Sequence, residues 1–109
     1  MRILITGVTG YIGSHLARRL LSSHQVFGLV REPVNMTYIR DIADKLTLLP
    51  YSGSGESLLE QVKHCKPDLV YHLAAYYTGA HDVENVTKLV SSNITLGAYL
   101  LEAMVSCGC

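Results

Sequence analysis

Several residue types are scarce in this chain, and each shortage excludes a class of protein. The 109 residues contain no Trp, one Phe, three Pro and three Cys. An odd number of cysteines without framework spacing argues against a disulfide scaffold and favours a reducing compartment. Net charge is zero, with nine basic and nine acidic residues. The chain therefore lacks the positive excess that is typical of partners of nucleic acid or anionic membranes.

Long hydrophobic runs are missing as well. The first apolar run, residues 3–5, ends at Thr6 and Gly7, and is shorter than the core of a secretory signal. No continuous apolar stretch approaches the roughly 18 residues of a membrane span. We therefore expect a cytoplasmic chain with no membrane partner. The mass of 12.0 kDa is that of one domain, and an apolar content of 49% predicts a packed core.

Short apolar runs alternate with helical patterns along the chain. Four runs predict strands that are largely apolar on both faces, at 3–5, 26–30, 46–49 and 69–73. Between them, we expect a helix that buries Ile12, Leu16 and Leu20, a short irregular helix at 36–45 and a short helix at 57–64. This order predicts an α/β fold over residues 1–109, namely a Rossmann-type parallel sheet of order 3-2-1-4 with helices on both faces.

A long helix is predicted from residue 83 to residue 105, with Asp82 as its N-cap. Apolar residues recur along it at steps of three and four, which predicts one buried face. The residues of that face are Val83, Val86, Val90, Ile94, Gly97, Leu101 and Met104, whereas Leu89, Leu96 and Leu100 lie off it.

The glycine-rich segment TGVTGYIG, residues 6–13, lies between the first strand and the first helix. In that context Gly7 allows a tight turn, Gly10 lets the backbone approach a pyrophosphate, and Gly13 lets the helix pack closely on the sheet. N–H groups at the helix N-terminus then face an anion. We therefore expect a phosphate-binding loop, rather than a turn that merely needs glycine, made by Gly7, Thr9, Gly10, Tyr11, Ile12 and Gly13.

The Gly-x-x-Gly-x-x-Gly spacing after a Thr resembles the short-chain dehydrogenase/reductase superfamily. PDLVYHLAA, residues 67–75, resembles the fourth strand of its extended subgroup. Residues 93–103 resemble the helix that follows, although Leu96 and Gly97 stand where that helix commonly has Gly and Thr. Together these segments resemble the N-terminal, dinucleotide-binding part of an extended short-chain dehydrogenase of the nucleotide-sugar epimerase/dehydratase type, truncated after the fourth strand–helix unit.

The resemblance implies NAD or NADP as cofactor. Arg31 ends the second strand about 18 residues past Gly13, where an acidic residue would favour NAD. A guanidinium instead offers several donors to a 2′-phosphate, so NADP is preferred, with a solvated Arg31 beside Glu32 as the alternative. Ser52 stands where the family usually has an Asp that contacts adenine, and the resemblance implies that its hydroxyl or backbone carbonyl takes that cofactor-binding role. The resemblance also implies that the backbone of Leu73, Ala74 and Ala75 lies along the cofactor.

In the family, a Tyr-x-x-x-Lys pair handles the proton while a hydride passes between nicotinamide and a sugar carbon. No tyrosine of this chain has a lysine four residues after it. We therefore expect no catalytic residue here, and expect the pair beyond Cys109 in a longer epimerase, dehydratase or reductase. A non-catalytic dinucleotide sensor that regulates a partner is the alternative, and the reaction type and sugar stay open.

A few other residues are candidates for function. Tyr76, Tyr77 and Thr78 follow the fourth strand, where ligands bind in open α/β sheets. Of these, Tyr77 and Thr78 are expected in the nucleotide-sugar site, with a plain surface loop as the alternative. His72 is expected to be a packed, hydrogen-bonded strand residue, and Cys107 and Cys109 lack the further ligands of a metal site. We expect a homo-oligomer through the open fourth strand or the long helix, which resembles the dimer-forming helix of the family.

Overall fold

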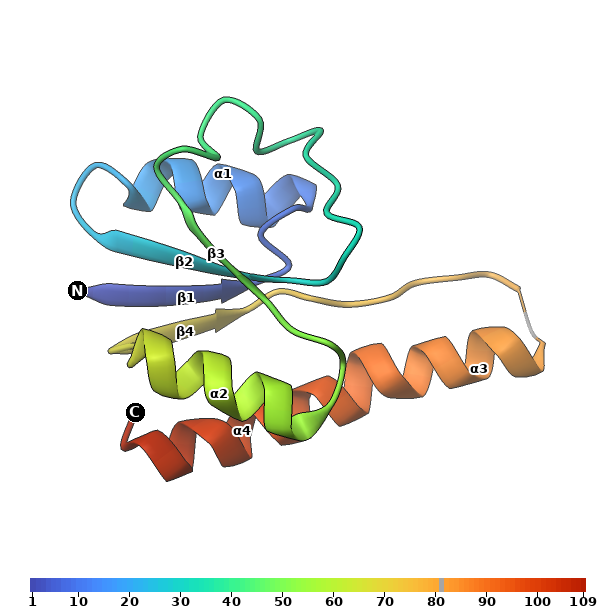
Figure 1. The fold of residues 1–109 in the computed structure, drawn as a ribbon. Coiled ribbons are helices and arrows are strands. Elements are labelled where there is room, and N and C mark those ends of the chain that lie inside the picture. Colours follow the sequence, from blue (N-terminus) through green and yellow to red (C-terminus); the bar gives the residue numbers. More distant parts are fainter. Residues whose placement is uncertain (81) are drawn as a thin grey trace.

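Four parallel strands form the centre of the molecule (Figure 1), a computed structural model that describes residues 1–80 and 82–109. They are β1 (Arg2–Thr6), β2 (Gln25–Val30), β3 (Thr47–Pro50) and β4 (Leu69–His72). The order across the sheet is β3-β2-β1-β4, and every neighbouring pair is parallel. The predicted Rossmann-type order 3-2-1-4 is therefore confirmed.

Helices cover both faces of this sheet (Figure 1). α1 (Tyr11–Leu20) lies on one face, and α2 (Gly55–Cys65) and α4 (Leu96–Cys107) lie on the other. Ile3 and Ile5 of β1 pack on the α1 side, whereas Leu4 packs on the α2 side. Because successive side chains of a strand point to opposite faces, a strand covered twice must be apolar throughout. That requirement explains the uninterrupted apolar run in β1.

Residues 36–45 form a series of turns, so the predicted short helix is wrong. The N–H groups of Ile39, Ile42 and Lys45 each bond to the carbonyl three residues earlier, at 2.9–3.1 Å. Arg18 of α1 holds the segment through the Tyr38 carbonyl at 2.6 Å and the Asp41 carboxylate at 2.7 Å. These turns bury Ile39 and Ile42 against the α1 layer.

The last helix is a single element of 25 residues, Val83–Cys107. It consists of α3 (Val83–Val90), a π-helical turn η1 (Ser91–Thr95) and α4. The predicted N-cap is confirmed, because the Asp82 carboxylate accepts the N–H of Asn85 at 2.8 Å.

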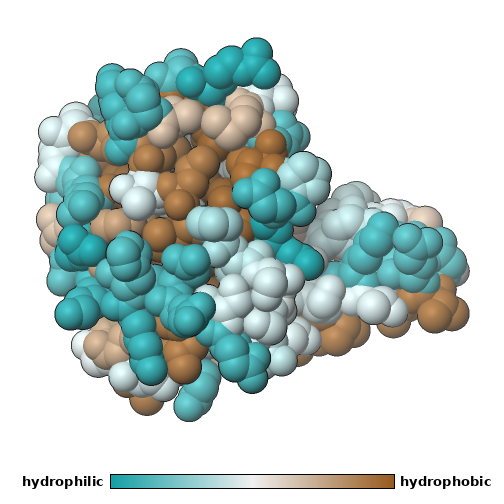
Figure 2. Space-filling model, in the orientation of Figure 1, coloured by the Kyte–Doolittle hydropathy of each residue, from teal (hydrophilic) through white to brown (hydrophobic). Residues whose placement is uncertain are grey.

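The predicted buried face of this helix is wrong. Val83, Val86, Val90, Ile94 and Leu101 are exposed, Val83 by 85%. Figure 2 shows brown, apolar surface along the lower edge of this projecting arm, below hydrophilic surface. α3 extends past the sheet (Figure 1), so that none of its residues is buried. The residues of α4 that contact the sheet and α2 are Leu96, Leu100, Ala103, Met104 and Cys107, and of these Met104 alone belongs to the predicted face. Periodicity identifies an apolar stripe but does not say what covers it.

By length and composition alone, Val83–Cys107 could cross a membrane, since its most apolar window has a mean hydropathy of 1.2. Its α4 half packs on the sheet, where Leu100 and Ala103 are almost fully buried. The expectation that the chain has no membrane span stays a prediction.

Candidate functional site

A cleft of about 410 Å³ opens where the parallel strands end. The loop after β1 forms its floor, with Thr6, Gly7, Thr9 and Gly10. One end is lined from β2 and β3, by Leu29, Val30, Arg31, Pro33, Val34, Asn35 and Tyr51. The other end is lined from β4 and the last helix, by Leu73, Ala74, Ala75, Ser91, Ser92 and Leu96. The cleft thus lies at the point where the strand order reverses, which is where open α/β sheets bind ligands.

Two glycines of the loop are required by close packing. Gly7 has a φ of +75°, and a Cβ on it would lie 2.7 Å from the backbone nitrogen of Ala74. A Cβ on Gly13 would overlap the carbonyl oxygen of Gly7. The loop is therefore pressed between the segment that leaves β4 and the first turn of α1. No other residue type fits these two positions without moving the backbone.

The N-terminus of α1 is free to bind an anion. The first intrahelical hydrogen bond runs from the Ser14 N–H to the Gly10 carbonyl at 2.9 Å, so the N–H groups of residues 11–13 have no partner within the helix. Gly10 provides no side-chain cap, and the first turn contains no acidic residue. The positive end of the helix dipole and these N–H groups together suit a phosphate.

Ile12, predicted to be buried, is 70% exposed, and Tyr11 beside it is 66% exposed. The reason is the close approach of α1 to the sheet, which places small residues at the contact. The buried residues of the helix are Gly13, Ser14 and Ala17. The large side chains of the first turn therefore point away from the sheet.

Thr6, the last residue of β1, connects the start of the glycine loop to the end of β4 through its side chain. Its buried hydroxyl oxygen accepts the N–H groups of Leu73 and Ala74, both at 3.1 Å, and lies 2.6 Å from His72 Nδ1. Because two N–H groups already donate to this oxygen, the hydroxyl proton is directed at Nδ1 of His72. The hydrogen bond expected of His72 is present, but its expected burial is wrong, since β4 is an edge strand and His72 is exposed.

Arg31 lies at the opposite end of the cleft. Its guanidinium carbon is 5.8 Å from the ring centroid of Tyr51. Among residues 1–80 and 82–109, it forms no ion pair with Glu32. Burial raises the pKa of the Tyr51 phenol, and the charge of Arg31 partly opposes that rise. Tyr51 was missed in the sequence; its place directly after the third strand was the available signal.

Ser52 does not line this cleft. It borders a smaller hollow that it shares with Arg31 and Tyr51. Its hydroxyl contacts the Ser54 hydroxyl at 3.2 Å, and its N–H donates to the Ser57 hydroxyl at 3.0 Å. Ser54 in turn caps α2 by accepting the Ser57 N–H at 3.1 Å. In this structure the Ser52 side chain thus belongs to the start of α2.

The residues after β4 divide between wall and surface. Leu73, Ala74 and Ala75 line the cleft, whereas Tyr77 is 92% exposed. The Thr78 hydroxyl accepts the Ala80 N–H at 3.1 Å. The cleft instead receives Ser91 and Ser92 from the π-helical turn. Sequence reasoning missed these two serines, because a π turn has no simple sequence signal.

A reversed-order parallel sheet with a glycine loop and an uncapped helix end at its switch point is a Rossmann-type dinucleotide-binding architecture. The model of the NAD dependent epimerase/dehydratase family matches residues 3–109. The chain belongs to that family, and the resemblance read from its motifs is confirmed.

Known relatives cover nearly all of this chain. It is 31% identical to CDP-abequose synthase of Yersinia pseudotuberculosis, over 98% of its own length and 36% of that protein. It is 33% identical to dTDP-D-glucose 4,6-dehydratase of Dictyostelium discoideum, over 93% of its own length and 25% of that protein. The structure of UDP-glucose 4-epimerase from Thermus thermophilus in complex with NAD matches with a TM-score of 0.83 and 26% identity. This match covers 99% of the present chain and 35% of the epimerase chain. The chain thus spans between a quarter and just over a third of the length of these relatives.

Proposed function

We propose that this chain is the dinucleotide-binding part of a nucleotide-sugar epimerase, dehydratase or reductase, in which hydride passes between nicotinamide and a sugar carbon. The observation that carries this proposal is the free N-terminus of α1 at the floor of the cleft, where the N–H groups of residues 11–13 lack partners within the helix. The names of the relatives support the substrate class, since they refer to CDP-, dTDP- and UDP-sugars. Among the residues that the structure describes, no feature of the cleft favours the dinucleotide sensor.

The cofactor is NAD or NADP, with NADP preferred. The family description and the NAD-bound relative support a nicotinamide dinucleotide. Arg31 supports the 2′-phosphate of NADP, because it lines the cleft without being neutralised by Glu32. Tyr77 and Thr78 remain the proposed sugar-side residues, supported by their place just beyond the β4 end of the cleft.

The charge, packing and exposed apolar surface of the protein support proposals about its compartment, its partners and its self-association. Zero net charge and the packing of α4 on the sheet support a cytoplasmic protein without nucleic-acid or membrane partners. The exposed stripe of Val83, Val86, Val90 and Ile94 supports self-association, as does the open edge of β4.

Calorimetric titration of the purified chain with NADP and with NAD tests the proposal. We expect weak, saturable binding of at least one of them. We also expect no turnover with nucleotide sugars, because no tyrosine here is followed by the required lysine. If neither dinucleotide binds at millimolar concentration, the proposal is wrong. Steady oxidation of NADPH in the presence of a nucleotide sugar would contradict the assignment of catalysis to residues outside this chain.

A further inference from the structure

The segment that leaves β4 forms a wall of the cleft without having secondary structure of its own. Leu73, Ala74 and Ala75 line the cleft. The Thr6 hydroxyl fixes the N–H groups of the first two, whereas no hydrogen bond described for Ala75 holds it in place. The next residue, Tyr76, is the one whose contacts attach this wall to the last helix.

Tyr76 is held at both its backbone and its side chain. The carboxamide of Asn93 accepts the Tyr76 N–H at 2.8 Å and donates to the Tyr76 carbonyl at 2.9 Å. The Tyr76 hydroxyl, at the far end of a half-buried ring, donates to Asn85 Oδ1 at 2.7 Å. Asn93 thus holds the backbone of Tyr76 at the π-helical turn, and Asn85 holds the far end of its ring at the start of α3, so that the residue is attached to the last helix at two points.

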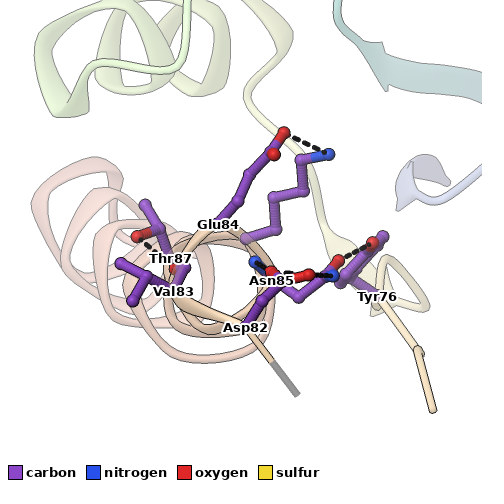
Figure 3. A network of polar contacts seen from close by, with 7 residues as sticks. Tyr76, Asp82, Val83, Glu84, Asn85 and Thr87 are labelled. Carbon is purple, nitrogen blue, oxygen red and sulfur yellow. Dashed lines mark hydrogen bonds and ion pairs between the residues drawn. The ribbon is translucent and has the colours of Figure 1, made fainter. Parts of the chain in front are cut away.

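The orientation of Asn85 is determined by Asp82 (Figure 3). Asn85 Nδ2 donates to both carboxylate oxygens of Asp82, at 3.0 and 2.9 Å, and the Asn85 N–H donates to one of them at 2.8 Å. A carboxylate only accepts, so the amide nitrogen faces Asp82 and the amide oxygen faces Tyr76. Asp82 and Asn85 thus form a preset acceptor for one phenol proton, at the start of α3.

We propose that Tyr76 is a positioning residue for the dinucleotide, and that its hydroxyl bond to Asn85 holds the cleft wall at Leu73–Ala75. This inference rests on the proposed function. If Arg31 binds the adenosine end of the dinucleotide, the rest of that molecule extends along the cleft toward the wall formed by Leu73–Ala75. Loss of the Tyr76–Asn85 bond then weakens contacts to the nicotinamide half and leaves those to the adenosine half intact.

The variant Tyr76→Phe tests this inference, because it removes only the hydroxyl group. NADP should bind about threefold to tenfold more weakly, the effect of one net hydrogen bond. Adenosine 2′,5′-bisphosphate, which represents the adenosine half, should bind as it does to the unaltered chain. NAD and ADP form the corresponding pair if NAD is the cofactor that binds more tightly.

A second variant and a control complete the experiment. Asn85→Ala should cause the same selective loss, and the double variant should lose no more than either single one, because both remove the same bond. Tyr99→Phe removes a tyrosine hydroxyl from the last helix, where the ring lies against Gly55 and does not line the cleft, and should change neither affinity.

Three results overturn the inference. The first is an unchanged dinucleotide affinity in Tyr76→Phe. The second is an equal loss for both ligands of a pair, which indicates general destabilisation rather than positioning of the wall. The third is failure of the unaltered chain to bind any of the four ligands, which overturns the proposed function as well and is thereby distinguished from the other two.

Discussion

Replacement of Arg31 by Asp reverses the charge at the β2 end of the cleft. Arg31 is exposed, lies 5.8 Å from the Tyr51 ring and forms no ion pair with Glu32. Its side chain contacts the Tyr51 ring and lies against Gly53, both on the surface beside the cleft, so the fold should tolerate the substitution. The main effect should fall on a ligand that carries negative charge near this end.

The magnitude follows from the contact that Arg31 would make to a 2′-phosphate. A charge-assisted hydrogen bond contributes about 1.5–3 kcal/mol. Its loss lowers NADP affinity by about tenfold to 150-fold, since about 1.4 kcal/mol corresponds to one factor of ten. Repulsion between the new carboxylate and the phosphate increases this loss. NAD has hydroxyl groups where NADP has that phosphate, so its affinity should hold or rise, because a carboxylate accepts hydrogen bonds from ribose.

Calorimetric titration of Arg31→Asp with both dinucleotides measures the two affinities directly. Arg19→Asp is a suitable control, since it makes the same charge change at an exposed residue of the last turn of α1 that does not line the cleft. Equal losses for NADP and NAD in Arg31→Asp would remove Arg31 from the 2′-phosphate site. An equal loss of NADP affinity in Arg19→Asp would show that the effect is a long-range one of net charge.

Three further outcomes are expected. Gly13→Ala should abolish dinucleotide binding and lower the free energy of unfolding, because the added Cβ overlaps the Gly7 carbonyl. Gly79→Ala is the control, since its Cβ has nothing within 4 Å, and it should change neither quantity. Calorimetric titration measures the binding, and urea unfolding measures the stability. Burial raises the pKa of the Cys65 thiol to about 11 from an ordinary 9.0, so the unfolded chain releases this proton first and stability should fall as pH rises from 9.0 to about 11. Urea unfolding at these pH values checks this, and Cys65→Ala should show a smaller fall. Val86→Glu combined with Ile94→Glu should convert an oligomer into a monomer in sedimentation, since both residues lie on the exposed stripe of the last helix; a native chain that sediments as a 12.0 kDa monomer would contradict self-association.

The sheet and the glycine loop could be predicted from the sequence because both leave local signals. A strand covered on both faces carries an unbroken apolar run, as at residues 3–5 of β1, and four apolar runs separated by helical patterns allow few arrangements. The roles of Gly7 and Gly13 could be predicted because backbone clashes exclude every other residue type at these two positions.

What could not be predicted depends on contacts between distant segments. The stripe from Val83 to Ile94 was expected to be buried, yet α3 extends beyond the sheet. Ile12 was expected in the core, yet the close approach of α1 favours small residues at the contact. The wall contact of Tyr76 with Asn85 and Asn93 requires the π turn and the N-cap together, and neither its partners nor its geometry follows from spacing along the chain.

Titration of the ¹⁵N-labelled chain with NADP, followed by amide resonances, tests dinucleotide binding at the glycine loop most directly. We expect saturable shifts at Tyr11, Ile12 and Gly13, whose N–H groups lack partners within α1, and at Ala74 in the opposite wall. Lys63 and His64, in the last turn of α2 and outside the cleft, should not shift. Saturating shifts elsewhere, with the resonances of residues 11–13 unchanged, would contradict dinucleotide binding at this site.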